Sequence, residues 1–297
     1  MSKTKLAFLT GGSGYIGRHV VSLLLNNGWK VALVSRPSTD LSFFIPWGSN
    51  LEIFEDDGTV NFIDRAIKSA LPDLVIHMAA VARPENTPDA INEMIDANLL
   101  LGVQILESMH KHGCKKFINT GTYWKRSSSQ TPDPMNLYAT TKLAFETFID
   151  FYVTSSEIQA VTLNLADVYG PNDFRPKLLT LLFNALQGGE AVDLTPGHQL
   201  INLCHVDDVA RAFLIAAEQV MDSFDPGHAE YAIAADKQLS IRDLVATIEN
   251  VSGRKIPVVF GAKAYRKREI MVPWFGKRLP QWRQEVSLES GLSEIFS

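Results

Sequence analysis

The stretch TGGSGYIG at residues 10–17 follows a short apolar run, KLAFLT at 5–10. An apolar run that glycines stop is typical of a strand buried on both faces. Beyond the glycines, the apolar residues of 20–25 recur with helical spacing, and Gly28 ends that pattern. The stretch therefore predicts a strand, a glycine-rich turn and a helix in that order.

The same alternation of apolar runs and helical patterns continues along the chain. Further strands are expected at 30–35, 51–54, 73–79, 116–120 and 160–165, and helical periodicity covers 91–112 and the segment around Tyr138. Strands that alternate with helices imply right-handed crossovers. The expected fold class is α/β, a Rossmann-type doubly wound parallel sheet.

After residue 168 the alternation loosens, because glycines and prolines separate shorter elements and 273–282 looks irregular. We expect these parts, 169–202 and 221–297, to form a smaller C-terminal α/β cap that binds the substrate. Residues 1–168 are expected to form a dinucleotide-binding domain, which a helical segment at about 203–220 rejoins.

Composition excludes several classes of protein. At 297 residues and 46% hydrophobic content the chain can bury a full core, and its formal charge of −5 with no basic run argues against nucleic acid as a partner. Apolar runs are too short to span a bilayer or to act as a signal peptide. Cys114 and Cys204 make neither a disulfide framework nor a metal site. We expect a cytoplasmic protein without membrane or metal partners, and a homodimer as its assembly.

The glycine-rich turn has the chemistry of a phosphate site. Gly11 permits the tight turn, Gly14 lets the backbone approach a pyrophosphate, and Gly17 lets helix and strand pack closely. Free amides at the start of the helix, near Tyr15 and Ile16, then face the phosphate charge. The context favours a dinucleotide site over a merely structural turn.

The end of the second strand bears on the choice of dinucleotide. NAD-selective folds place an acid there, whereas this chain has Ser35-Arg36. An arginine can pair with a 2′-phosphate, with help from Arg18, although a solvated loop charge is the ordinary alternative. The cofactor is therefore expected to be NADPH, with NAD as the alternative. After the third strand, Asp56 or Asp57 could accept a hydrogen bond from the adenine amine.

Tyr138 and Lys142 lie one helical turn apart on one face of a predicted helix. A nearby ammonium favours the phenolate, which brings the phenol pKa down from about 10 toward the range of a proton shuttle. This spacing also occurs by chance. It gains value because the preceding strand ends at Thr122, whose hydroxyl can hold the substrate oxygen that Tyr138 protonates. The alternative for Thr122 is a helix or turn cap.

Several of these motifs together resemble one family. The resemblance covers nearly the whole chain and rests on TGGSGYIG at 10–17, HMAA at 77–80, Asn98, Thr122, YATTK at 138–142 and VYGP at 168–171. These motifs are similar to those of the extended short-chain dehydrogenases/reductases, which act largely on nucleotide-activated sugars.

That resemblance implies a catalytic triad of Thr122, Tyr138 and Lys142, with Lys142 also holding the nicotinamide ribose. The remaining cofactor residues expected on this basis are Ala79, Ala80, Asn98 and Val168. The residues expected at the substrate are Val81, Thr122, Tyr123 and Tyr138.

The reaction type is suggested by the residues after Thr122. In the 4,6-dehydratase branch an Asp-Glu pair follows the threonine, whereas Tyr123-Trp124 follows here, so dehydration lacks its acids. The segments 117–124, 240–253 and 258–271 are most similar to the CDP-paratose and CDP-abequose synthases. The expected function is NADPH-dependent reduction of the C4 keto group of a nucleotide-linked 4-keto-6-deoxy or 3,6-dideoxy sugar, in deoxysugar or O-antigen (lipopolysaccharide) biosynthesis.

Two departures bear on how the nucleotide is held. Ile201 and Asn164 stand where an arginine is common in the family, so other cations are expected at the diphosphate. The candidates are Arg175, Lys177, Arg266 and Arg268. His77 and His205 are expected to be packed or hydrogen-bonded strand residues rather than catalysts.

Two other functions stay open. One is a nucleotide-sugar epimerase that retains NAD, against which Arg36 argues. The other is a non-catalytic dinucleotide-binding protein on the same fold, against which the intact Thr, Tyr and Lys set argues.

Overall fold

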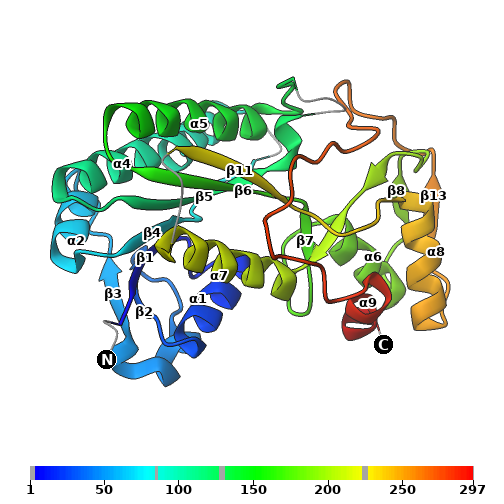
Figure 1. The fold of residues 1–297 in the computed structure, drawn as a ribbon. Coiled ribbons are helices and arrows are strands. Elements are labelled where there is room, and N and C mark those ends of the chain that lie inside the picture. Colours follow the sequence, from blue (N-terminus) through cyan, green and yellow to red (C-terminus); the bar gives the residue numbers. More distant parts are fainter. Residues whose placement is uncertain (1–3, 84–85, 127–130, 223–226, 297) are drawn as a thin grey trace.

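The computed structural model describes residues 4–83, 86–126, 131–222 and 227–296. Its centre is a seven-stranded parallel sheet, shown in Figure 1, with the strand order β11-β6-β5-β4-β1-β2-β3. The bounds are β1 Leu6–Thr10, β2 Lys30–Ser35, β3 Leu51–Glu55, β4 Leu74–His77, β5 Lys116–Thr122, β6 Gln159–Leu165 and β11 His228–Ile233. The predicted Rossmann-type α/β fold is confirmed.

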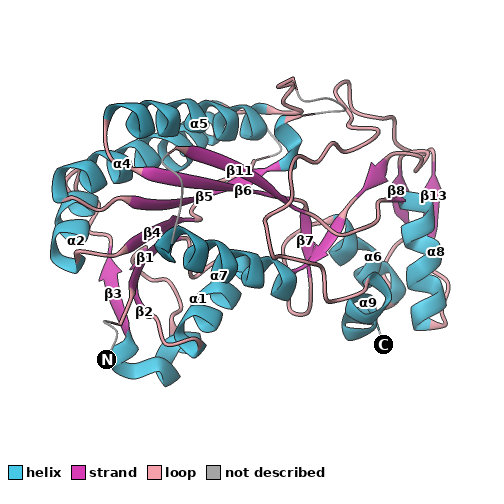
Figure 2. Cartoon of the chain, in the orientation of Figure 1, coloured by secondary structure: helices cyan, strands magenta, loops and turns pink. Residues whose placement is uncertain are grey.

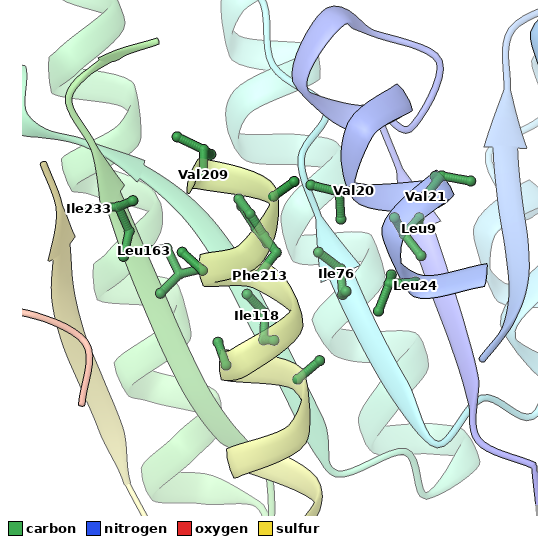
Figure 3. Close-up of a cluster of buried hydrophobic side chains, with 14 of the residues drawn as sticks. Leu9, Val20, Val21, Leu24, Ile76, Ile118, Leu163, Val209, Phe213 and Ile233 are labelled. Carbon is green, nitrogen blue, oxygen red and sulfur yellow. The ribbon is translucent and has the colours of Figure 1, made fainter. Parts of the chain in front are cut away.

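Helices cover both faces of this sheet, as Figure 2 shows. One face is covered by α1 (Tyr15–Asn26) and α7 (Val206–Asp222), and the other by α2 (Phe62–Ala70), α4 (Leu101–His112) and α5 (Leu137–Ser155). In Figure 3, Val20 and Leu24 of α1 and Phe213 of α7 point at sheet residues such as Ile76 and Ile118. The inner strands β1, β2 and β4 are largely apolar because both of their faces are buried in this way.

Strand β11 corrects one predicted boundary. The sequence places residues 228–233 in the cap, but they pair with residues 160–165 of β6 and extend the central sheet. The sequence HAEYAI does not read as a buried run, because only its last two residues are buried. The outer edge of β11 is covered in turn, since Ala232 donates its N–H to the carbonyl of Lys277 (2.7 Å).

The rest of the chain builds a smaller lobe, drawn on the right of Figure 1. Its elements are α6 (Leu178–Leu186), β8 (Val192–Leu194), β9 (Leu200–Ile201), β12 (Leu239–Ser240), α8 (Ile241–Ser252), β13 (Val258–Phe260) and α9 (Leu288–Phe296). They share a separate apolar core around Leu182, Leu244 and Leu292. A parallel pair, β7 (Asp167–Tyr169) with β10 (Leu203–His205), lies where the chain passes between the lobes.

Four further elements complete the description. They are the 3-10 segment η1 (Ser42–Asn50), the helix α3 (Pro88–Ile95), the π-helical turn η2 (Asp96–Leu100) and the 3-10 turn η3 (Tyr123–Lys125). Among the helices of the described residues, none combines the length and apolar character needed to cross a membrane.

Candidate functional site

Residues singled out from the sequence gather at the carboxyl edge of the sheet. Strands β1, β2, β4 and β5 end there at Thr10, Ser35, His77 and Thr122. The chain crosses from one side of β1 to the other between β3 and β4, so the strand order reverses next to β1. In open α/β sheets such a reversal opens a crevice at the carboxyl ends of the strands, where ligands bind.

The glycine loop is shaped by close backbone contacts. Gly11 has a φ of +75°, and a Cβ there would lie 2.5 Å from the amide nitrogen of Ala79. A Cβ on Gly17 would lie 2.2 Å from the carbonyl oxygen of Gly11. Gly14 precedes α1, and a Cβ there would meet only the Gly11 carbonyl, at 3.3 Å. The loop therefore presents the start of α1, including Tyr15 and Ile16, as a site for an anion.

Ser35 and Arg36 lie beside this loop. The parallel register sets Thr10 opposite Val34, so the residues that follow each strand are neighbours. Ser35 is buried, and its Oγ has no hydrogen-bond partner among the described residues. Arg36 is exposed. A buried hydroxyl without a partner next to an exposed guanidinium fits a phosphorylated ribose, which offers acceptors to both.

Asp56 and Asp57 are engaged in their own turn. Asp56 accepts from the Gly58 N–H (2.9 Å), and Asp57 accepts from the Thr59 N–H (3.0 Å) and forms an ion pair with Arg65. The hydrogen bond from the Thr59 side chain, more than Arg65, lowers the pKa of Asp57. A contact with adenine stays a prediction for both.

Asn98 organises the loop after β4. Its side chain accepts from the Val81 N–H and donates to the Val81 carbonyl, both at 2.8 Å, and it also donates to Thr141 Oγ1 at 3.0 Å. It lies fully buried in the π-helical turn η2, an irregularity that is frequent at functional sites. Asn98 therefore fixes the Ala79–Val81 loop against α5. Val168 is also buried, in the core, and its carbonyl faces Lys177 (3.3 Å).

Thr122, Tyr138 and Lys142 are brought to the same edge by β5 and α5. Thr122 caps η3 by accepting from the Trp124 N–H (3.3 Å), and the Trp124 ring lies edge-on to the ring of Tyr138 at 6.2 Å. Asn136 caps α5 just before Tyr138 and thereby fixes where that helix starts. Lys142 is buried, and its Nζ has no hydrogen-bond partner within the described parts of the chain.

Burial sets the acid-base properties of Tyr138 and Lys142. It raises the pKa of Tyr138 to about 12, against a smaller lowering by the charge of Arg175. The expected lowering of this pKa by Lys142 is therefore wrong for the ligand-free protein, because the cost of burying a phenolate outweighs the nearby positive charge. Burial also lowers the pKa of Lys142 to about 8, where Glu146 acts in the opposite direction and Lys125 adds to the lowering. A buried ammonium without a partner is costly. An incoming polar group that accepts a hydrogen bond would therefore be bound favourably at Lys142.

Tyr123, expected at the substrate, is tied to a carboxylate that the sequence did not single out. Its hydroxyl donates to Asp167 Oδ2 at 2.8 Å. Burial raises the pKa of Asp167, and Lys177, the hydrogen bond from Tyr123 and Arg175 oppose that rise. Asp167 directly precedes the VYGP motif at 168–171. This position next to a family motif is the sequence signal that could have identified it as a site residue.

Three of the four predicted diphosphate cations, Arg175, Lys177 and Arg268, already have partners for their side chains within the protein. Arg175 forms an ion pair with Asp173 (2.6 Å) and lies 4.6 Å over the ring of Tyr15. Lys177 donates to the Val168 carbonyl, and burial lowers its pKa. Arg268 forms an ion pair with Asp133 and donates to the Pro134 carbonyl (3.0 Å). Arg266 is exposed. Arg175 thus lies against the glycine loop, and Arg268 links the cap to the segment before α5.

Asn164 and Ile201, which stand where the family commonly has an arginine, make contacts within the protein. Asn164 donates to Glu230 (3.2 Å), and Ile201 pairs with Leu239 in the cap. Asn202, next to Ile201, is buried and bonds to main-chain atoms of 235–237. His77 and His205 are buried strand residues, as expected. Within the described ranges, no group of three or more His, Cys, Asp or Glu side chains could hold a metal ion.

Sequence comparisons find similarity to enzymes whose names refer to nucleotide-linked sugars. The chain is 28% identical over 270 residues to a CDP-abequose synthase of Yersinia pseudotuberculosis, covering 89% of this chain and 90% of that protein. It is 24% identical to UDP-glucose 4-epimerase 2 of rice (Oryza sativa subsp. japonica), covering 96% of this chain and 79% of that protein.

A solved structure shows the same fold. The UDP-glucuronic acid 4-epimerase of Bacillus cereus, in complex with UDP-glucuronic acid and NAD, superposes with a TM-score of 0.85 at 22% identity, covering 98% of both chains. The profile of the NAD dependent epimerase/dehydratase family matches residues 7–234. This protein belongs to the NAD dependent epimerase/dehydratase family.

Proposed function

We propose that this protein is an NADPH-dependent reductase of the C4 keto group in a nucleotide-linked 4-keto-6-deoxy or 3,6-dideoxy sugar. The observation that carries the proposal is the gathering of Thr122, Tyr138 and a buried, unpartnered Lys142 at the crevice beside the glycine loop. The similarity to a CDP-abequose synthase along most of both chains supports the substrate class.

The residues present fit a phosphorylated dinucleotide. The glycine loop and the start of α1 would hold the pyrophosphate, Ser35 and Arg36 the 2′-phosphate, and Lys142 the nicotinamide ribose. When bound, NADPH supplies the hydride. The chain's own groups would then handle the proton and the orientation of the sugar.

Tyr138 is the proposed proton donor to the C4 oxygen, and Thr122 holds that oxygen in place by a second hydrogen bond. With a pKa raised by burial to about 12, Tyr138 carries its proton at neutral pH, as a donor must. The Lys142 ammonium favours the phenolate that remains after transfer. Because Tyr123-Trp124 follows Thr122, no carboxylate from this segment is available for water loss.

The decisive experiment offers NADPH with CDP-, dTDP- and GDP-linked 4-keto-6-deoxy sugars and follows the loss of NADPH absorbance. Tyr138→Phe should lower kcat about 1,000-fold because it removes the proton donor. Tyr152→Phe is the matched control, since Tyr152 is on the same helix but its hydroxyl bonds to Glu107 (2.7 Å). The proposal fails if no nucleotide-linked keto sugar oxidises NADPH.

A second candidate is an epimerase that retains NAD and both oxidises and reduces its substrate. The similarity to the rice UDP-glucose 4-epimerase over 96% of this chain favours it. A protein that is purified with tightly bound NAD, and that turns over a UDP-sugar without added cofactor, would decide for this candidate. Arg36 at the end of β2 favours the reductase.

A further inference from the structure

A buried group of charges lies directly behind the candidate site. The ammonium of Lys125 bonds to Glu146 and, at 2.8 Å, to Glu230. The side chain of Lys125 is 1% exposed and that of Glu146 is 6% exposed. Arg126 (3.5 Å) and Asn164 (3.2 Å) complete the surroundings of Glu230. The side chain of Glu230 is 35% exposed and so lies at the rim of this group. We call Lys125, Glu146 and Glu230 the charge network.

The network joins the two elements that carry the proposed catalytic groups. Lys125 ends η3, three residues after Thr122. Glu146 lies one helical turn after Lys142 on the buried side of α5. The Lys125–Glu146 bond therefore holds the end of β5 against the helix of Tyr138 and Lys142.

The network places one negatively charged group, the carboxylate of Glu146, near Lys142. The ionisable groups that face Lys142 are Glu146 and Tyr138 on α5, Lys125 in η3 and His77 on β4. Tyr138, with a pKa of about 12, is neutral near pH 7. Glu146 is faced in turn by Lys125, by Glu230 on β11 and by His228, which is paired with Asp150. Because His77 is buried and its pKa is lowered to about 3, it is neutral near pH 7 and cannot supply a charge. Glu146 is thus the single negative group beside Lys142 among the described residues.

Resting on the proposed function, we propose that Lys125, Glu146 and Glu230 are positioning residues, which keep the ammonium of Lys142 charged and aimed at the cofactor ribose. Glu146 provides the negative charge that favours a buried ammonium. Burial raises the pKa of Glu146 and the charge of Glu230 adds to that rise, whereas Lys125 opposes it. The charge of Lys125 itself disfavours the Lys142 ammonium, so Lys125 acts in its favour only through Glu146, whose carboxylate it holds ionised and fixed. Glu230 holds Lys125 in place from the other side.

The test is the pH dependence of NADPH binding, measured by NADPH fluorescence from pH 7 to 10, where the 2′-phosphate no longer titrates (second pKa about 6). Binding by the wild type should weaken with a midpoint near 8, the pKa of Lys142. Glu146→Gln keeps a hydrogen-bond acceptor for Lys125 but removes the charge. Its midpoint should fall by about one pH unit, since a nearby opposite charge shifts a pKa by one to three units.

A second variant removes the pair while sparing the fold. In Lys125→Met/Glu146→Leu, apolar side chains replace a buried ion pair, an exchange that is often neutral or stabilising. The midpoint should still lie below that of the wild type, because Glu146 affects Lys142 more strongly than Lys125 does. Glu107→Gln is the control, since Glu107 also contacts α5, through Tyr152, and should leave the midpoint unchanged.

An unchanged midpoint in folded Glu146→Gln, or in the folded double variant, overturns the positioning role and leaves the proposed function intact. A wild type that binds neither NADPH nor NADH at any pH overturns both. A lowered midpoint in both variants, with a normal one in Glu107→Gln, supports the role.

Discussion

On the sheet side of the candidate site, Ser35 Oγ and Lys142 Nζ are buried without partners among the described residues, whereas on the cap side the predicted substrate cations are already bonded. Arg175 pairs with Asp173, and Arg268 pairs with Asp133. Ser35 and Lys142 on the sheet side can therefore bond to a ligand without first breaking a hydrogen bond within the protein. The cap side has to exchange one partner for another when an anion arrives, and that exchange lowers the net gain in binding.

The largest expected effect comes from Lys142→Met, which removes the unpartnered cation from the sheet side. It should lower kcat about 1,000-fold through loss of the charge beside Tyr138. The ligand-free protein should nevertheless melt at a higher temperature, because an apolar side chain of similar length replaces a buried ammonium that has no hydrogen-bond partner among the described residues. Steady-state kinetics and a thermal melt check both. A lower melting temperature would mean that Lys142 is not held at a cost.

Arg36→Asp tests a second predicted ligand contact on the sheet side. The exchange places an acid where NAD-selective folds carry one, and it repels a 2′-phosphate. The ratio of kcat/KM for NADPH to that for NADH should fall roughly 100-fold, from loss of a charge-assisted contact and gain of a repulsion. Arg65→Asp serves as the control, since Arg65 is also an exposed arginine at this end of the sheet but is paired with Asp57. Equal ratios in the wild type and Arg36→Asp would refute the assignment of the phosphate.

The cap side predicts opposite effects for the two members of one ion pair. Arg268→Ala should raise KM for the nucleotide sugar about fivefold, while Asp133→Asn should lower it, because the carboxylate no longer competes for the guanidinium. Lys267→Ala is the control, since Lys267 is an exposed cation next to Arg268 that is not a candidate for the diphosphate. If both members of the pair raise KM equally, then Arg268 serves the cap geometry and not the diphosphate.

The smallest effect concerns stability in acid. Burial, aided by Lys142, lowers the pKa of His77 from 6.5 to about 3. Between these values the unfolded chain binds the proton and the folded chain does not, so the free energy of unfolding falls as the pH drops from 6.5 to 3. His77→Gln cannot titrate there and can still bond to Thr10. Its denaturant midpoint should change less with pH than that of the wild type, and equal slopes would contradict this account.

The sheet was predictable from sequence because its inner strands are buried on both faces and appear as apolar runs. β11 is not predictable as a strand of this sheet, because most of its residues are only partly buried and do not form an apolar run. The strands of the cap are two or three residues long, too short for any periodicity to appear.

The candidate site shows the same limit. Thr122, Tyr138 and Lys142 are recognisable because the helix and the strand end carry them in local patterns. Tyr123 and Asp167 meet across 44 residues of sequence, and Lys125 meets Glu230 across 105. Contacts of this range depend on strand order and not on local spacing, so one sequence alone does not reveal them.

The late position of β11 in the chain has a consequence for biosynthesis. As the protein leaves the ribosome, β6 emerges well before its outer neighbour, because β7 to β10 and α7 come between them. Until residues 228–233 follow, β6 is an open, apolar edge that invites association between nascent chains. Even then β11 is covered only when residues near 277 arrive. Chains that stop short of this point are expected to be the ones that chaperones must retain.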